Sequence, residues 1–358
     1  MNSPHTASIS SDSSEAANQR RILEGCLLGT AVGDALGLPS EGLGPNAVTR
    51  RFGGPDRFHL IGRTGFVSDD TEQSALVAEA ITLHPNNSVA CADHFRRELG
   101  RWFLRLPFGI GRATITASVR SLLGVRPSGV MSAGNGAAMR AAIIGAAFRD
   151  DPARRREFGA VLAEVSHIHP LAVDGARYVA EVAAGLCSGR QRPEAAVSDA
   201  LAQCSEPILQ QALTDALQAV ELQPTEAART LGNSGYVVHT CAFATYALLH
   251  APDEEPVSRL WNAIRAGGDA DSIGAIVGGW IGAAEGPEAF PSELVGCLHD
   301  GPYGPTHLRG LAATMAEAVS GRQTAPPEYS RGAAMARNLA LYPVVLAHGF
   351  RRLAPPYG

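Results

Sequence analysis

Two groups of acidic side chains have the residue types and the spacing that chemistry requires. Asp269 and Asp271 stand one residue apart inside the glycine-rich, apolar run "AGGDADSIGAIVGG". Ser68, Asp69 and Asp70 precede the helix-forming run "TEQSALVAEAITLH". An unpartnered buried carboxylate costs several kcal/mol or more, so these charges should be paired, solvated or bound to a cation.

With Ser272, which follows Asp271, the two groups offer only oxygen ligands. Hard cations such as Mg²⁺ and Mn²⁺ prefer oxygen donors, whereas zinc favours His or Cys. Four carboxylates exceed what one Mg²⁺ usually takes, so we expect a pair of ions about 4 Å apart. The groups are about 200 residues apart in the sequence, so only the fold can bring them together.

A purely structural explanation is also available for each group. Asp69 as an N-cap, with Glu72 three residues later, would form a capping box, and acidic side chains suit the start of a helix. Ser272 would cap the apolar helix that follows it in the same way. Taken alone, the spacing is compatible with caps and with ligands.

Composition excludes several classes of function. The chain has 358 residues, of which 45% are hydrophobic and 6% aromatic, and its net charge is −5. This balance, without a basic stripe, argues against nucleic-acid binding. All 30 basic residues are arginine, which excludes lysine Schiff-base chemistry and a P-loop lysine. The six cysteines form no CxxC pair, so we expect small buried residues.

Helical periodicity dominates the chain, and the signals for strands are weak. The joins are short and rich in Gly, Pro or Asp, which predicts one compact all-α domain built of many helices. Helices are expected at 21–37, 71–84, 89–105, 112–123, 136–148, 157–168, 171–187, 194–203, 207–219, 235–250, 257–266, 272–284, 308–319 and 331–352.

Two of these segments carry glycine at every fourth residue. The stripes consist of Gly25, Gly29, Gly33 and Gly37, and of Gly274, Gly278 and Gly282. Glycine inside a helix costs about 1 kcal/mol relative to alanine, so another interaction should compensate. Since the stripe lets another backbone approach, we expect these helices to pack closely in the core.

The chain begins with a polar, Ser-rich segment, residues 1–20, that lacks the apolar region of a signal peptide. We expect this segment to be a disordered tail. No apolar run reaches the roughly 18 to 20 residues of a membrane span. A cytoplasmic monomer without membrane contact is therefore the expectation.

Six motifs occur in the order in which a known family carries them: "GCLLGTAVGDALGLPSEG", "SDDTEQS", "GNGAAMR", "SHIHP", "SGYVVHT" and "GGDADSIGAIVGGWIGAAEG". The chain resembles the ADP-ribosylglycohydrolases over residues 21–320. The resemblance implies an orthogonal all-α fold with a binuclear Mg²⁺ (or Mn²⁺) centre at the floor of an ADP-ribose cleft. Residues 321–358 would then be a C-terminal extension whose final helix packs on the domain.

The resemblance also implies a role for individual residues. The metal ligands would be Ser68, Asp69, Asp70, Asp269, Asp271 and Ser272, and the catalytic carboxylates Glu41, Asp69 and Asp70. The substrate-binding residues would be Ser132, Gly134, Asn135, Gly136, His167, Tyr236 and Gly268. Without the resemblance, Glu41 reads as a loop carboxylate, His167 as a core histidine and Tyr236 as a packing residue.

One position departs from the family pattern. Many relatives carry Asp-Ile-Gly where this chain reads "FGIG", so Gly109 replaces a carboxylate that faces the guanidinium in relatives acting on ADP-ribosyl-arginine. The metal set is unaffected, but the expectation of an arginine-linked substrate is weakened.

These observations predict a metal-dependent hydrolase that removes ADP-ribose from a modified protein or a small acceptor. The transition state at the anomeric carbon would resemble an oxocarbenium ion. The alternative is a degenerate member of the family that binds ADP-ribose or has become structural. An isoprenoid cyclase is disfavoured because Gln73 interrupts DDxxD, and a DxD-type phosphatase because a helix, not a strand, is expected before Asp269.

Overall fold

The computed structural model describes the backbone of residues 5–352, and nearly all side chains of residues 14–350. In this part of the chain the elements are helices and isolated β-bridges, without a strand, so the predicted all-α class is confirmed. The α-helices are α1 (His5–Gly37), α2 (Pro45–Phe52), α3 (Asp69–Leu83), α4 (Ser88–Phe103), α5 (Arg112–Leu122), α6 (Ala142–Ala147), α7 (Pro152–Glu164), α8 (Pro170–Leu186), α9 (Pro193–Leu201), α10 (Pro207–Gln218), α11 (Pro224–Leu231), α12 (Val237–Leu249), α13 (Pro256–Ile264), α14 (Ala270–Glu285), α15 (Ser292–Gly296), α16 (Pro305–Val319) and α17 (Arg331–Arg352). Short 3₁₀ turns are η1 (Leu38–Ser40), η2 (Asn135–Ala137), η3 (Cys187–Gly189) and η4 (Pro287–Ala289).

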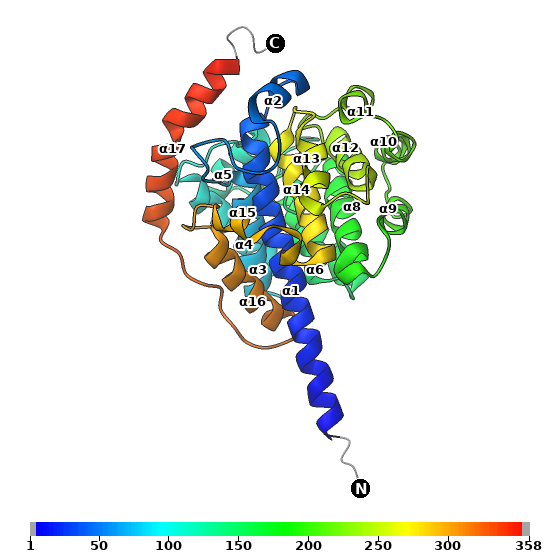
Figure 1. The fold of residues 1–358 in the computed structure, drawn as a ribbon. Helices are drawn as coiled ribbons and strands as arrows, with labels where there is room; N and C mark the ends of the chain where they lie inside the picture. Colours follow the sequence, from blue (N-terminus) through cyan, green and yellow to red (C-terminus); the bar gives the residue numbers. More distant parts are fainter. Residues whose placement is uncertain (1–4, 353–358) are drawn as a thin grey trace.

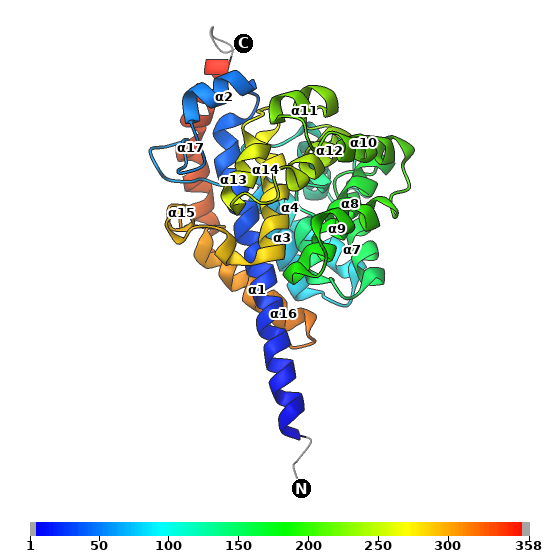
Figure 2. The same cartoon turned by 45° about the vertical axis from the view of Figure 1, so that its right-hand side comes forward.

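Helix α1 lies side by side with α14, and the remaining helices are arranged around this pair (Figure 1). Figure 2, turned by 45°, shows the same two helices in contact. Both helices are buried almost throughout the matching part of their length. The pair therefore forms the centre of the hydrophobic core.

The two glycine stripes face each other across this contact. A Cβ atom on Gly33 would lie 1.9 Å from the carbonyl oxygen of Gly274, and one on Gly29 would lie 2.1 Å from that of Gly278. At these distances the backbones of α1 and α14 touch directly, so no larger residue fits. The expected close packing of the two glycine-striped helices is confirmed.

The segment Ser14–Ser40 of α1 and η1 is long and apolar enough to cross a membrane by length and composition. The expectation that no segment meets this criterion is therefore wrong. However, 94% of its apolar window is buried inside the protein. Its apolar character is explained by its place in the core.

Helix α1 also extends backwards into the segment that was expected to be a disordered tail. It begins at His5, and the side chain of Gln19 is buried with its Nε2 donating to the carbonyl oxygen of Ala146 at 2.9 Å. Glu15 forms an ion pair with Arg149. Residues 5–20 thus differ from the prediction, because the core helix continues and finds partners outside the core; residues 1–4 lie outside the described part of the chain.

The helix expected at 136–148 is much shorter than predicted. Residues 135–137 form η2, and α6 begins only at Ala142. The backbone before it bonds to other loops, with the Asn135 N–H donating to the Gly235 carbonyl oxygen at 3.0 Å. Three short helices, α2, α11 and α15, were not predicted.

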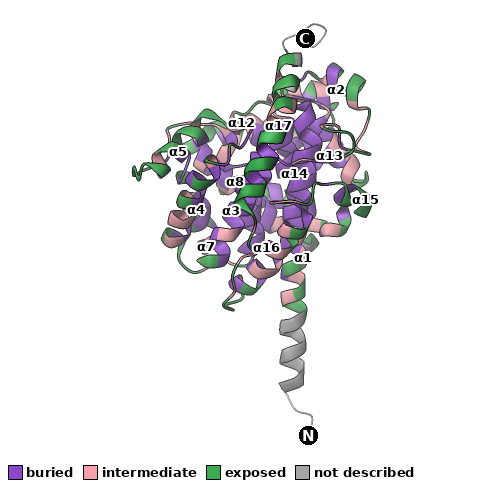
Figure 3. Ribbon diagram, turned by 90° about the vertical axis from the view of Figure 1, so that its left-hand side faces the viewer, coloured by how far each residue is buried: buried purple, intermediate pink, exposed green. Residues whose placement is uncertain are grey.

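The final helix α17 spans the predicted range and packs on the domain through a few side chains. Leu341 forms a small apolar cluster with Leu38 and Phe108. The opposite face of α17 is exposed, as Figure 3 shows. The helix thus covers the loops that leave α1 and α4.

The glycine contact predicts an unusual response to alanine. We expect Gly33→Ala to lower the free energy of unfolding by about 3 kcal/mol or more, since the new Cβ would overlap the Gly274 backbone. Gly159→Ala in α7 is the matched control, because its Cβ would meet only Arg177 Cγ at an ordinary 3.6 Å. It should stabilise by about 0.5–1 kcal/mol. Chemical denaturation measures both; equal effects of the two substitutions would contradict the proposed contact.

Candidate functional site

The end of α1 and the start of α14 bring the second acidic group to the first. A Cβ on Gly37 would lie 2.3 Å from the Ala270 carbonyl oxygen and 2.6 Å from Asp271 Cα. The start of α3 is bonded to α1 one turn earlier, at Asp34. Three helix ends therefore meet at one place, and the two groups that are distant in sequence lie together.

Asp34 is the residue that binds α3 to α1. Its buried Oδ2 accepts hydrogen bonds from the Ser68 N–H at 2.9 Å, from the Thr71 N–H at 3.1 Å and from the Thr71 hydroxyl. The sequence analysis missed Asp34. The available signal was an aspartate in the middle of an apolar, glycine-striped helix, where a charge needs a reason to be buried.

The first acidic group is buried at the start of α3. Ser68 is the N-cap residue, and its hydroxyl both accepts from the Asp70 N–H at 3.4 Å and donates to Asp70 Oδ2 at 3.1 Å. Asp69 Oδ2 accepts from Gln73 Nε2 at 2.9 Å. The capping box centred on Asp69 is therefore wrong, because Ser68 caps the helix and Glu72 turns to other partners.

The second acidic group opens α14. Asp269 is the N-cap residue and accepts from Asn135 Nδ2, while its own N–H donates to the Asn233 carbonyl oxygen at 2.8 Å. Asp271 Oδ1 accepts from the Ser272 N–H at 3.0 Å. Ser272 lies inside the helix, so the prediction that it caps α14 is wrong.

Glu41 lies close to Asp69, Asp269 and Asp271. Its turn is held against the start of α14 by two backbone hydrogen bonds, Gly42 N–H to Gly268 O at 2.6 Å and Gly268 N–H to Leu43 O at 3.1 Å. The charge of Glu41 helps to raise the pKa values of Asp69 and Asp271. Unlike those two aspartates, Glu41 is only half-buried.

Asp34 and the aspartates of the two acidic groups, Asp69, Asp70, Asp269 and Asp271, together form what we call the acidic group. Burial raises the pKa values of all its carboxyl groups, and mutual repulsion raises three of them further. Burial raises the pKa of Asp34 to about 6 in spite of its hydrogen bonds. Burial, followed by the charges of neighbouring carboxylates, raises the pKa values of Asp69, Asp70 and Asp271 well above their usual range. So many carboxyl groups are tolerated together only when protons or cations neutralise them.

The donor set fits divalent cations in its chemistry. All the side chains are oxygen donors, and the buried Oδ1 atoms of Asp34 and Asp70 have no hydrogen-bond partner. Among the described residues, no three His, Cys, Asp or Glu side chains already surround a common point as metal ligands do. The carboxylates instead turn toward neighbouring donors such as Gln73 and Asn135.

The loop predicted to bind phosphate and ribose lies against this group, but part of its hydrogen-bonding capacity is used inside the protein. The Gly134 N–H donates to the Ser132 hydroxyl at 3.2 Å. Asn135 Nδ2 donates to Thr240 Oγ1 at 3.0 Å as well as to Asp269. The amide of Asn135 thus positions Asp269, and hydrogen bonds to Thr240 and within the loop itself fix the conformation of the loop.

His167 is buried behind the same loop. A Cβ on Gly136 would lie 2.8 Å from His167 Cε1, so glycine is required for this contact. The Ser166 hydroxyl bonds to His167 Nδ1 at 2.8 Å, and burial together with the charge of Arg140 lowers the pKa of His167 to about 3. The imidazole is therefore neutral at physiological pH.

Two further predicted residues lie near the loop in different roles. Tyr236 is the half-exposed N-cap residue of α12 and packs edge-on against His239 with ring centroids 5.1 Å apart. Gly268 adopts a positive φ of 72° and lies against Asn233, where a Cβ would be only 2.3 Å from the carbonyl oxygen. Gly268 therefore shapes the turn that precedes the second acidic group.

Arg140 connects the acidic group to this loop, and the sequence analysis missed it. Its buried guanidinium donates to Gln73 Oε1 at 2.9 Å and to Ser166 Oγ at 2.6 Å, and also to the Gly136 carbonyl oxygen. Gln73 in turn holds Asp69. The only sequence signal was an arginine ending the quoted motif "GNGAAMR".

Residues 15–325 match the family described as ADP-ribosylglycohydrolase. The chain belongs to this family. Membership of the family supports hydrolytic removal of ADP-ribose as the general activity. The resemblance drawn from the six motifs is confirmed.

Individual relatives agree with this assignment. An uncharacterized protein of Archaeoglobus fulgidus is 32% identical over 269 residues, which are 72% of this chain and 86% of that protein. The ADP-ribosyl-[dinitrogen reductase] glycohydrolase of Rhodospirillum rubrum is 26% identical over 275 residues, 75% of this chain and 87% of the relative. A solved ADP-ribosylglycohydrolase-related protein complex aligns with a TM-score of 0.64 and 27% identity, covering 84% of this chain and 99% of that one.

A cavity of about 690 Å³ lies elsewhere on this ADP-ribosylglycohydrolase, between α1, α7 and α16. None of its lining residues belongs to the acidic group. The candidate site is therefore defined by its chemistry and by the family motifs rather than by the volume of this cavity.

The raised pKa values predict how stability depends on pH when no divalent cation is present. A folded-state pKa above the unfolded value means that the folded protein holds extra protons, so stability falls as pH rises through the shifted pKa. We expect the thermal midpoint in chelator to fall as pH rises above about 6, the pKa of Asp34, because the pKa values of Asp69, Asp70 and Asp271 are shifted in the same direction. His167 acts in the opposite direction below about pH 7.5, where only the unfolded state holds its proton, and it adds nothing above that pH.

Asp70→Asn is the variant that tests this origin of the pH dependence. It removes one buried carboxylate whose pKa is raised, and should make the fall in the midpoint shallower. Asp215→Asn, at a side chain that is not part of the acidic group, is the control and should leave the slope unchanged. Equal slopes for Asp70→Asn and the unsubstituted protein, or a changed slope for Asp215→Asn, would contradict the interpretation.

Proposed function

We propose that this protein hydrolyses the bond between the anomeric carbon of an ADP-ribosyl group and its acceptor, with divalent cations held by the acidic group. The observation that carries the proposal is the convergence of Asp69, Asp70, Asp269 and Asp271 in a buried site, where Asp70 Oδ1 and the neighbouring Asp34 Oδ1 have no hydrogen-bond partner. Membership of the glycohydrolase family supports the reaction type.

The two groups would hold the cations from opposite sides. Ser68, Asp69 and Asp70 come from the start of α3, and Asp269, Asp271 and Ser272 from the start of α14. When bound, Mg²⁺ or Mn²⁺ supplies Lewis acidity that orients ribose hydroxyls and lowers the pKa of water. The protein's own contribution is to hold these carboxylates rigidly, through Asp34, Gln73 and Asn135.

We assign the movement of the proton to Glu41. Asp69 and Asp70 are buried and turned toward protein donors, whereas Glu41 is half-buried on a turn that borders the group. A carboxyl group that moves a proton in hydrolysis must reach the solvent side of the reacting carbon. Glu41→Gln should therefore lower kcat by about 100-fold while the affinity for ADP-ribose stays within about 2-fold.

The loop at Gly109 bears on which acceptor is removed. Gly109 has a positive φ of 83°, and a Cβ there would lie 2.7 Å from Asp69 Oδ1. Gly109 thus lies close to Asp69 without room for a side chain, and this position offers no carboxylate to pair with a guanidinium. We propose an acceptor other than arginine.

A panel of substrates tests the acceptor and the cation together. Protein or peptide substrates with ADP-ribose on serine and on arginine, and an O-acyl ester of ADP-ribose, are incubated with Mg²⁺, with Mn²⁺ and with chelator. We expect oxygen-linked substrates to be hydrolysed at least about 10-fold faster than arginine-linked ones, and chelator to abolish turnover. Undiminished turnover in chelator would contradict the cation requirement.

Asp271→Asn separates a hydrolase from a protein that only binds ADP-ribose. We expect kcat/KM to fall by about 100-fold or more, because the variant removes a charge from the cation-binding group. Asp300→Asn, on the exposed loop before α16, is the matched control and should retain full activity. ADP-ribose binding by calorimetry without hydrolysis by the unsubstituted protein would favour the degenerate alternative.

A further inference from the structure

Helix α17 buries two polar side chains although most of the helix is exposed. Arg337 is 9% exposed and Asn338 is 1% exposed. Figure 3 shows exposed residues on the outer face of the same helix. The helix also lies beyond residues 15–325, the part of the chain that matches the family. Two adjacent buried polar residues on such a helix need partners in the body of the protein.

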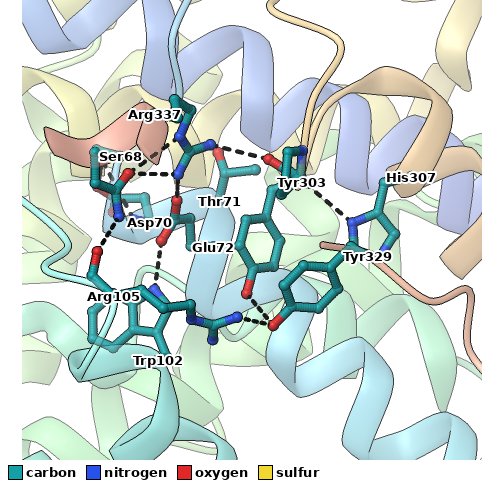
Figure 4. Close-up of polar contacts among 12 residues, drawn as sticks. Ser68, Asp70, Thr71, Glu72, Trp102, Arg105, Tyr303, His307, Tyr329 and Arg337 are labelled. Atoms are coloured by element: carbon teal, nitrogen blue, oxygen red, sulfur yellow. Dashed lines mark hydrogen bonds and ion pairs between the residues drawn. The ribbon is translucent and has the colours of Figure 1, made fainter. Parts of the chain in front are cut away.

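Arg337 reaches the helix that carries the first acidic group. It forms an ion pair with Glu72, whose other carboxylate oxygen accepts from the indole N–H of Trp102 (Figure 4). Arg337 Nη1 also donates to the Pro302 carbonyl oxygen at 3.0 Å. Glu72 lies two residues after Asp70 on α3, so α17 is connected to the floor of the site.

Asn338 extends this connection to the α4–α5 loop, which comprises residues 104–111. Its Oδ1 accepts from Arg337 Nη2 at 2.9 Å, and its Nδ2 donates to the Arg105 carbonyl oxygen at 2.9 Å. Four groups are thus joined in sequence, from the Glu72 carboxylate through Arg337 and Asn338 to the loop backbone. The side-chain amide of Asn338 thus acts both as a donor and as an acceptor in this series of hydrogen bonds.

The path of the α4–α5 loop is strained at the point where α17 holds it. Leu106 has a positive φ of 55°, a conformation that costs a leucine about 1 kcal/mol or more. The residue before it is bonded to Asn338, and the carbonyl oxygen of Pro107 after it accepts from the Tyr342 hydroxyl at 3.3 Å. Contacts on both sides of Leu106 therefore maintain a conformation that the loop would not prefer alone.

The Arg105 side chain is held by the C-terminal extension as well. Its guanidinium donates to the Tyr329 hydroxyl and lies over the Tyr329 ring at 5.2 Å. Tyr303 in turn donates to the Tyr329 hydroxyl at 2.8 Å, as Figure 4 shows. Both the backbone and the side chain of Arg105 are thus fixed by residues after 320.

The strained loop ends at the acidic group. Three residues after Leu106, Gly109 places its backbone against Asp69, with a positive φ of 83°. Between them, Phe108 packs on Leu341 of α17. The position of Gly109 at Asp69 therefore depends on contacts made by α17.

We propose that Asn338 is a positioning residue, which holds the α4–α5 loop in its strained path and so keeps Gly109 against Asp69. The proposal rests on the proposed hydrolase function for its effect on turnover. A displaced loop changes the surroundings of Asp69 where the acceptor leaves, and a shift of about 1 Å near reacting groups can cost about 100-fold in rate. The residues expected from the family motifs to bind ADP-ribose, Asn135, His167 and Tyr236, lie on other elements, so we expect the affinity for ADP-ribose to be unchanged.

Asn338→Asp is the decisive variant because it keeps the shape and the acceptor for Arg337 but removes the donor to Arg105. Hydrogen–deuterium exchange is measured for the peptide that covers residues 104–111. We expect its exchange to accelerate by about 10-fold or more. With substrate, kcat should fall by about 10-fold while the affinity for ADP-ribose stays within about 2-fold.

Two further variants keep the test independent of global folding. Tyr342→Phe removes only the hydrogen bond to Pro107 and should accelerate exchange in the same peptide to a smaller extent. Arg331→Met, on the same helix, removes an exposed arginine whose partner Glu98 keeps Arg101, and should change neither exchange nor kcat. If Asn338→Asp proves unstable, Asn338→Leu, which has a similar size and also lacks the donor to Arg105, is measured in its place.

Two results would overturn the proposal. Unchanged exchange of residues 104–111 in the Asn338 variant would show that Asn338 does not hold the loop. Accelerated exchange with unchanged kcat would show that the loop's position does not matter for turnover. Hydrogen–deuterium exchange needs no substrate. If the protein had no hydrolase activity, the proposed function would be refuted, but exchange would still test whether Asn338 holds the loop.

Discussion

Direct backbone contact between α1 and α14 is the constraint on which the site depends. Glycine every fourth residue on both helices removes the Cβ atoms that would separate them, and the loss of intrinsic helix stability is offset by close packing of two core helices. The contact runs up to Gly37 and the start of α14, so it fixes where Asp271 lies relative to Asp34. The relative position of the acidic side chains is thus set by glycine residues, which carry no side chain themselves.

Repulsion within the acidic group opposes the close packing of α1 and α14. Packing brings Asp34, Asp69, Asp70 and Asp271 into a helical interior, where burial and mutual repulsion raise their pKa values. Hydrogen bonds from Ser68, Thr71 and Gln73 neutralise part of this cost. A divalent cation would balance the remaining negative charge. Its binding would therefore relieve the repulsion among the carboxylates, and this relief would add to the affinity for the cation.

Local patterns and motifs were sufficient for the all-α fold, most helices and the residues of the two acidic groups. The glycine stripes predicted close packing in the core, but the structure was needed to show that the two striped helices are each other's partners. The helix expected at 136–148 was wrong because residues 135–137 bond to other loops, which local periodicity does not register. Asp34 was missed because its partners are more than thirty residues away, and the pairing of Glu72 with Arg337 spans 265 residues. Such contacts follow from the fold, not from spacing.

Joint binding of divalent cations by the two acidic groups can be tested most directly in crystals grown with Mn²⁺ and measured near the manganese absorption edge. We expect two anomalous peaks about 4 Å apart, enclosed by Asp69 and Asp70 on one side and by Asp269 and Asp271 on the other. Well-ordered carboxylates with no anomalous density between them would contradict it.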